Sequence, residues 1–196
     1  RLGGNSLTET LVYGRRSGAA AAALSRRREF QARSRLAVSA ALDDLDSFLH
    51  DGTEIVRPVQ RALRNMMWQH CGVVRSEEGL KEGLIELEAL KSALADIDVR
   101  PTAEGYGDLA HVLDLRASLA TAEATLLGAL ERRESRGAHT RSDFPNLDEA
   151  LRVNIQVRGS DGALVVARQP VPPIPDDLRE WAEGGEEMAA EGRLLE

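Results

Sequence analysis

The chain has 196 residues and a formal net charge of −7, and 42% of its residues are hydrophobic but only 4% are aromatic. This length allows one or two small domains, and an apolar content drawn mainly from Leu and Ala favours helices over sheets. The acidic balance argues against nucleic acid as a partner, since neutralising phosphates needs a basic face, and no apolar run approaches the ~20 residues that a membrane span requires.

The chain opens with an arrangement typical of half of a ligand site. Arg1, whose guanidinium can hold a carboxylate, is followed by Gly3-Gly4, which leaves room for a ligand close to the backbone. Ser6 and Glu9 have capping-box spacing, which predicts a helix over residues 7–24. The N-terminus of such a helix favours an anion. We therefore expect a ligand site completed by a larger polypeptide; the alternative is that Arg1 is an exposed terminal residue without function.

Further helices and a β-hairpin are predicted along the rest of the chain. Apolar residues that recur every three or four positions indicate helices, and strict alternation indicates strands. The predicted helices cover residues 33–50, 58–71, 77–97 and 108–133, and the strands cover 151–157 and 163–167, with a longer loop between them. Pro58, Gly72 and Ser76 stand where a first-turn proline, a helix stop and an N-cap are expected.

These elements predict a mainly α fold. Short loops between the last three long helices indicate an antiparallel three-helix bundle, similar to a spectrin repeat, with a short C-terminal β-hairpin and an extended tail. Four prolines between residues 170 and 175 impose the extended segment. We divide the chain into residues 1–32 (loop plus helix), 33–145 (helical domain), 146–175 (hairpin and extended segment) and 176–196 (an acidic tail, either a weak helix or disordered).

The segment over residues 131–145 carries Arg136, His139 and Arg141, side chains that together can bind an anion. In the alternative interpretation, which we favour, the segment is a polar helix terminus. Its Arg and His side chains then hydrogen-bond the last carbonyls of the helix, with a Glu or Asp nearby. His139 is also a candidate general base by residue type, but the sequence names no partner for it.

Met66-Met-Trp68 is interpreted as part of the core, because Met and Trp at helical spacing usually pack inside. Cys71 is the only cysteine, which excludes an intrachain disulfide, and its place near a helix C-terminus predicts an unreactive thiol. Asp43, Asp44 and Asp46 lack the pattern of a calcium loop and are interpreted as a solvated face. No metal site is expected.

Three stretches together resemble the C-terminal part of the succinate dehydrogenase/fumarate reductase flavoprotein family, which also includes L-aspartate oxidase. They are Arg1–Leu7 with Gly14-Arg15, Met67–Arg75, and Glu134–Arg141 with Asp143–Pro145. The resemblance covers most of residues 1–145 and fades beyond Ala150. Gly3-Gly4 and Ala138 resemble the succinate/fumarate branch more than the aspartate oxidases.

The resemblance implies an FAD enzyme that interconverts succinate and fumarate by hydride transfer at the flavin. It implies that Arg1 binds a substrate carboxylate, that Ser6 and Leu7 contact the flavin, and that residues 1–32 are the terminal loop and helix of an FAD-binding domain. Arg136 and His139 are expected to support the fold or domain docking. The dinucleotide-binding motif and the other substrate residues are expected upstream, so the fragment alone is expected to be inactive.

The resemblance also implies that an iron–sulfur electron-transfer subunit is the partner and that the role is in electron transport. The expected location is the cytoplasm, or the cytoplasmic face of the inner membrane through partner subunits. Two alternatives stay open: an L-aspartate oxidase fragment, and a non-catalytic helical interaction module whose acidic tail contacts a partner. Residues upstream of Arg1 that line a flavin would favour either enzyme hypothesis over the non-catalytic interaction module.

Overall fold

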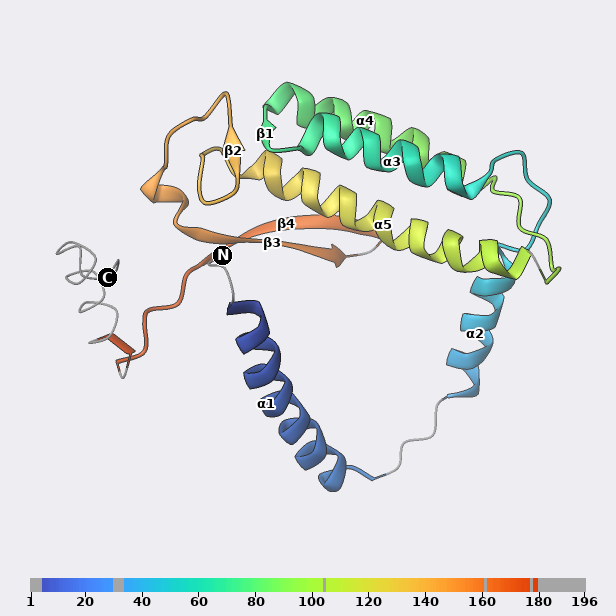
Figure 1. Cartoon of the computed structure of the whole chain (residues 1–196), viewed down its shortest axis with the longest axis horizontal. Coiled ribbons are helices and arrows are strands. Elements are labelled where there is room, and N and C mark those ends of the chain that lie inside the picture. Colours follow the sequence, from blue (N-terminus) through green and yellow to red (C-terminus); the bar gives the residue numbers. More distant parts are fainter. Residues whose placement is uncertain (1–4, 30–33, 104, 161, 177, 180–196) are drawn as a thin grey trace. The chain divides into compact units, whose positions relative to one another are not determined.

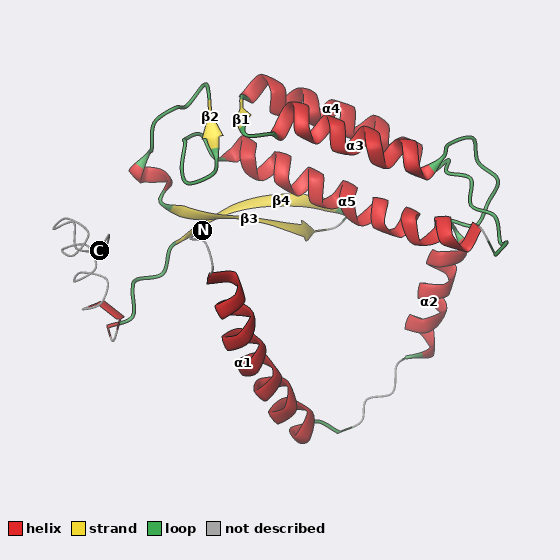
Figure 2. Ribbon diagram, viewed as in Figure 1, coloured by secondary structure: helices red, strands yellow, loops and turns green. Residues whose placement is uncertain are grey.

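The computed structural model describes residues 5–29, 34–103, 105–160, 162–176 and 178–179. It divides the chain into two compact units, Arg1–Ser47 and Phe48–Glu196. The fold is mainly helical, as predicted (Figures 1 and 2). The finer division of the chain into four segments stays a prediction.

The first unit contains two helices, α1 (Asn5–Arg27) and α2 (Arg35–Asp46). α1 begins two residues before the predicted start, so Ser6 lies inside the first turn and is not the N-cap expected from the capping box. The capping-box spacing marks only a local pattern, and a helix end predicted from such a pattern is easily one or two residues away from the observed one. α2 ends before the predicted residue 50, because its last turn carries acidic and no basic side chains. Negative charge is unfavourable at a helix C-terminus.

The second unit is built on a bundle of α3 (Val56–Cys71), α4 (Glu77–Leu94) and α5 (Gly105–Glu131). Consecutive helices run in opposite directions, which confirms the antiparallel arrangement (Figure 1). Pro58 lies in the first turn of α3, and Gly72 is its C-cap, as predicted. The Ser76 hydroxyl accepts a hydrogen bond of 3.1 Å from the Gly79 N–H, which confirms Ser76 as the N-cap of α4.

One apolar core joins the three helices. Its fully or nearly fully buried members include Val56, Val59, Leu63 and Met66 of α3, Leu80 and Leu87 of α4, and Val112, Leu115, Leu119, Ala122 and Leu126 of α5. These residues recur every three or four positions, so each helix presents one apolar stripe to its neighbours. Each large side chain contributes roughly 1.5–3 kcal/mol on burial, which makes this shared core the main stabilisation of the bundle.

A β-hairpin covers another side of α5 (Figure 1), and it consists of β3 (Val153–Ser160) and β4 (Ala163–Pro170). Alternate residues of β3 are shielded, as the sequence pattern predicted. Ser160 pairs with Ala163, so two residues connect the strands, and the longer loop predicted from the sequence is wrong. The reason is the Asp-Gly pair in between: Gly162 has a φ of 82°, the left-handed backbone that a two-residue turn needs.

Two very short strands, β1 (Val74–Arg75) and β2 (Thr140–Arg141), pair in parallel, and a 3-10 turn covers Glu149–Leu151. The pair ties the start of α4 to the loop after α5. The sequence did not predict it, because two residues are too few to show an alternating pattern. Residues 171–175 have no regular secondary structure, in line with their prolines, and most of the acidic tail lies outside the described residues.

We expect two helical glycines of the bundle to respond in opposite ways to alanine. A Cβ at Gly83 of α4 would lie 2.9 Å from the His70 Cβ and 3.1 Å from a Leu126 methyl, whereas one at Gly128 of α5 would meet only Val157, at 3.7 Å. Gly83→Ala should therefore lower the free energy of unfolding by about 2 kcal/mol through overpacking. Gly128→Ala should raise it by roughly 0.5–1 kcal/mol through helix propensity. Urea denaturation of both variants measures this, and a similar effect at both sites would contradict the packing.

Candidate functional site

The N-terminal candidates lie at the edge of what the structure describes. Arg1 and Gly3-Gly4 fall outside the described residues. Ser6 is half-buried and Leu7 exposed, and both lie in the first turn of α1. This turn contains no acidic side chain, so the helix does not neutralise its own positive end. A helix start of this kind favours an electron-rich or anionic group, and the flavin contacts expected for Ser6 and Leu7 stay predictions.

The best-defined polar network surrounds Arg141, in the loop after α5. The Arg141 guanidinium is fully buried, and it donates two parallel hydrogen bonds to the Asp143 carboxylate, of 2.8 and 2.7 Å. Its Nη1 donates to the carbonyl oxygens of Ala129 (2.9 Å) and Arg132 (3.2 Å) at the C-terminus of α5. This guanidinium holds the pKa of the Asp143 carboxyl far below its usual value. Arg141 thus caps α5 and has its charge paired internally.

A second buried charge, Glu134, ties the same loop to the hairpin. Its Oε1 accepts hydrogen bonds from Arg132 (2.5 Å) and Arg136 (2.8 Å), and its Oε2 accepts one from the Asp148 N–H (2.9 Å). Arg132 also donates to the Val153 carbonyl, 2.7 Å away at the start of β3. The hydrogen bond from Arg136 is the main cause that lowers the pKa of Glu134 to about 2.

His139 is held by two hydrogen-bonding partners with opposite roles. Its Nδ1 lies 2.9 Å from Nη1 of Arg75, a pure donor, and its Nε2 lies 3.1 Å from the Arg132 carbonyl oxygen, a pure acceptor. These partners require a neutral ring with the proton on Nε2. Burial, the largest cause, lowers the pKa of His139, and the nearby arginines act in the same direction. Both nitrogens are engaged, so the geometry does not support a general base.

The favoured interpretation of the segment 131–145 is therefore confirmed. Arg141 and His139 bind the last carbonyls of α5, and Arg136 binds Glu134 and the Asp148 carbonyl. The anion site proposed as the alternative is not formed, because these groups already have partners within the loop. The sequence did not identify Glu134 as the centre of this network, because several acidic residues lie close enough along the chain to pair with these arginines, among them Glu131, Asp143 and Asp148.

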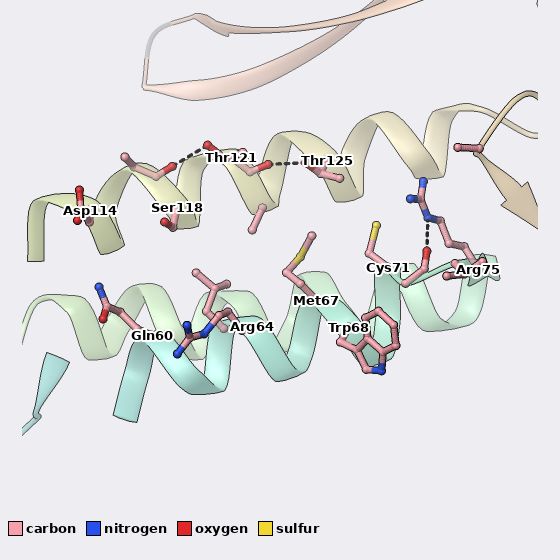
Figure 3. A pocket seen from close by; sticks show the side chains of 16 residues that line it. Gln60, Arg64, Met67, Trp68, Cys71, Arg75, Asp114, Ser118, Thr121 and Thr125 are labelled. Atoms are coloured by element: carbon pink, nitrogen blue, oxygen red, sulfur yellow. Dashed lines mark hydrogen bonds between the residues drawn. The ribbon is translucent and has the colours of Figure 1, made fainter. Parts of the chain in front are cut away.

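A groove of about 1080 Å³ runs between α3 and α5 (Figure 3). Met66 is buried, as predicted, but Trp68 is 76% exposed and lines this groove, so its assignment to the core was wrong. The buried residues of α3 follow a three- and four-residue spacing through Leu63, Met66 and His70, and Trp68 falls between two of these steps. Its side chain is therefore directed away from the core.

Cys71 is buried beside the same groove. Burial raises the pKa of its thiol, and the charge of Arg75 opposes this shift as the smaller cause. The raised pKa agrees with the unreactive thiol predicted from the sequence, because desolvation outweighs the charge of the nearby Arg75.

One family model matches most of the bundle, the loop after α5 and the hairpin. The model described as fumarate reductase flavoprotein C-term matches residues 60–171, more than half of the chain. The chain therefore belongs to this family of flavoprotein C-terminal domains.

Individual relatives agree with this assignment. The chain is 34% identical over 149 residues to one of the subunits of the fumarate reductase (CoM/CoB) from Methanothermobacter marburgensis, covering 74% of this chain and 26% of the relative. It is 31% identical over 182 residues to the fumarate reductase flavoprotein subunit of Mycobacterium tuberculosis, covering 87% and 31%. The solved Mycobacterium smegmatis Sdh1 complex in the apo form superposes with a TM-score of 0.80 at 31% identity, covering 91% and 32%. The chain thus spans between a quarter and a third of the length of these relatives.

Two further findings concern the described part of the chain. None of its helices combines the length and the apolar character needed to cross a membrane. Within the same residues, no group of three or more His, Cys, Asp or Glu side chains is arranged to hold a metal ion.

Proposed function

We propose that this chain is the C-terminal region of an FAD-dependent flavoprotein subunit that interconverts succinate and fumarate. The observation that carries the proposal is the family match over residues 60–171. The names of the relatives, which are fumarate reductases and succinate dehydrogenase flavoprotein subunits, support it. These matches favour the succinate/fumarate interpretation over L-aspartate oxidase and over a non-catalytic module.

In this proposal the first residues form one wall of the active site. FAD, when bound, accepts or supplies the hydride that converts one dicarboxylate into the other. Arg1 binds a substrate carboxylate through the two parallel donors of its guanidinium. Ser6 and Leu7 contact the flavin from the N-terminus of α1, and the absence of acidic side chains in that turn supports this role. The bundle and its loop network act as the scaffold behind them.

The proposed partner is an iron–sulfur electron-transfer subunit, with electron transport as the wider role. The solved relative from Mycobacterium smegmatis is named as a complex, which supports an assembly of subunits. We place the parent protein in the cytoplasm, or on the cytoplasmic face of the inner membrane through such partners. The activity belongs to the full-length flavoprotein.

Replacing Arg1 with lysine in the full-length flavoprotein tests the proposal. Lysine keeps the charge but loses the paired donors, so kcat/KM for fumarate reduction should fall roughly thirtyfold, about 2 kcal/mol of barrier, with flavin content unchanged. Arg26→Lys, at the far end of α1, is the matched control for this substitution. In the unmodified protein, anaerobic bleaching of the flavin by succinate checks the substrate.

Three outcomes would contradict parts of the proposal. A full-length protein without bound flavin refutes the proposed function. Bleaching by aspartate alone favours L-aspartate oxidase. A barrier raised by less than ~1 kcal/mol in Arg1→Lys shows that Arg1 does not hold the carboxylate.

A further inference from the structure

α3 is the cationic helix of the bundle. Its 16 residues include three arginines, Arg57, Arg61 and Arg64, which we call the arginine row, and neither Asp nor Glu. The neighbouring helices α4 and α5 carry five and four acidic residues, and the whole chain has a net charge of −7. The surface of α3 is therefore opposite in sign to the rest of the bundle.

The arginine row follows one side of α3. Its members are four and three residues apart, a spacing that places side chains beside one another on a helix. All three are exposed, whereas Val59 and Leu63 are buried in the core, so the row points away from the core. Like charges at this spacing repel each other and destabilise a helix. An anionic partner would offset that repulsion along the whole row.

Within the part of the chain that the structure describes, no carboxylate is paired with the arginine row. Arg57 contacts a neutral group, with its Nη2 atom 2.7 Å from Nε2 of His111, and Arg61 and Arg64 make no hydrogen bond or ion pair there. The first turn of α3 also has no acidic side chain, so the positive end of the helix dipole adds to the charge of Arg57. Charge complementarity therefore favours an occupant with several carboxylates.

We propose that the arginine row is the docking surface for the acidic segment over residues 180–196 of the same chain. This segment contains six glutamates and one arginine, and it lies outside the described residues. Its carboxylates bind the guanidinium groups of the row, so the contact is electrostatic and neutralises the exposed side of α3. The contact requires neither flavin nor substrate.

The covalent connection is the reason for choosing this occupant over a separate protein. Residues 180–196 span up to about 56 Å when extended, whereas α5, the longest helix of the bundle, has 27 residues and is about 40 Å long. Length therefore does not prevent the segment from reaching α3. A segment of the same chain is present at a high effective concentration, so exposed ion pairs that are individually weak are enough to hold it.

Carbodiimide crosslinking in the full-length flavoprotein tests the proposal. The reagent joins an amine to a carboxylate in contact with it, so Arg61→Lys keeps the charge of the row and adds a reactive group. Arg158→Lys is the matched control, because Arg158 of β3 is also exposed and lies outside the row. Mass spectrometry of the digest identifies the linked peptides. We expect position 61 to link within one polypeptide to glutamates of residues 180–196, at least fivefold more than position 158.

A charge reversal within the row provides the second arm. Added to Arg61→Lys, Arg64→Glu should lower the yield of this link several-fold, whereas Arg133→Glu, at an exposed position outside the row, should preserve it. Arg64 is exposed and makes no hydrogen bond within the described residues, so the variant should fold. Raising the ionic strength from about 0.01 M to about 1 M should also lower the yield several-fold, because it shortens the screening length from about 30 Å to about 3 Å.

Links from position 61 mainly to a second copy, to another subunit or to residues outside 180–196 would overturn the proposal, as would equal linking from position 158. A yield unchanged by Arg64→Glu would show that the arginine row does not hold the segment. Flavin absorbance of the same sample separates the two proposals. A flavin-loaded protein without the link refutes the docking surface alone, whereas a protein with the link and without flavin refutes the proposed function alone.

Discussion

Replacing Arg141 with lysine should lower the free energy of unfolding by about 3 kcal/mol or more, because it breaks a buried charge pair and uncaps a helix. The guanidinium makes two hydrogen bonds with Asp143 and three with carbonyls at the end of α5, and its carbon Cζ lies 5.0 Å from the centre of the Phe144 ring. An ammonium group cannot make the paired contact with Asp143 and reach the Ala129 carbonyl at the same time. The carboxylate and the carbonyls would then lose hydrogen bonds that the folded protein has no other group to replace.

Denaturant unfolding of the full chain measures this effect. Arg133→Lys is the matched control, because Arg133 lies in the same loop but is exposed. The control should change the free energy of unfolding by less than about 0.5 kcal/mol. A loss below about 1 kcal/mol in Arg141→Lys would show that Arg141 is not the cap that holds the end of α5.

Replacing Glu134 with glutamine should cost about 3 kcal/mol of stability at pH 7, because two arginines lose their buried counter-charge. The pKa of Glu134 is lowered from 4.5 to about 2 in the folded protein, chiefly by the hydrogen bond from Arg136. A lowered folded-state pKa means that the unfolded chain binds the proton more readily. The stabilisation is therefore complete above pH 4.5 and is lost as the pH falls toward 2; by linkage it amounts to about 3 kcal/mol.

The pH dependence of the free energy of unfolding distinguishes the contribution of the Glu134 carboxylate from those of other acidic groups. Asp143 also has a lowered pKa, so the unmodified protein and Glu134→Gln should both lose stability in acid. The difference between their free energies of unfolding should shrink as the pH falls from 4.5 toward 2. The exposed variant Glu78→Gln should follow the unmodified protein throughout. A difference that stays constant with pH would contradict the ionised, arginine-paired Glu134.

Local features of the fold were predictable from the sequence where one segment carried the whole signal. Pro58, Gly72 and Ser76 mark helix ends by backbone chemistry that acts within a few residues, and each acts as predicted. The end of α2 and the length of the hairpin loop were predicted wrongly, because in each case a second local effect competed with the one that the prediction used. The acidic last turn ended α2 early, and the turn around Gly162 closed the hairpin more tightly than its polar composition indicated.

The residues of the candidate site also fall into those that a local motif identifies and those whose partners lie elsewhere in the fold. Arg1, Ser6 and Leu7 were identified from a motif, and their roles stay predictions, since Arg1 lies outside the described residues. The helix-terminus interpretation of Arg136, His139 and Arg141 could be favoured because charged side chains after a helix usually meet its free carbonyls. Which acids neutralise them could not be predicted, because Asp143 and Glu134 were two among many acidic residues.

The sequence alone therefore determined the helices, the hairpin, the caps at Gly72 and Ser76 and, through its motifs, the resemblance to a flavoprotein C-terminal region. Only the tertiary structure decided that Glu134 and Arg141 are buried and that Trp68 faces an open groove. The physical reason is that capping and periodicity depend on neighbours in the chain. Burial and charge pairing depend on distant segments, such as the hairpin that receives Arg132 and the α3–α5 pair that forms the groove.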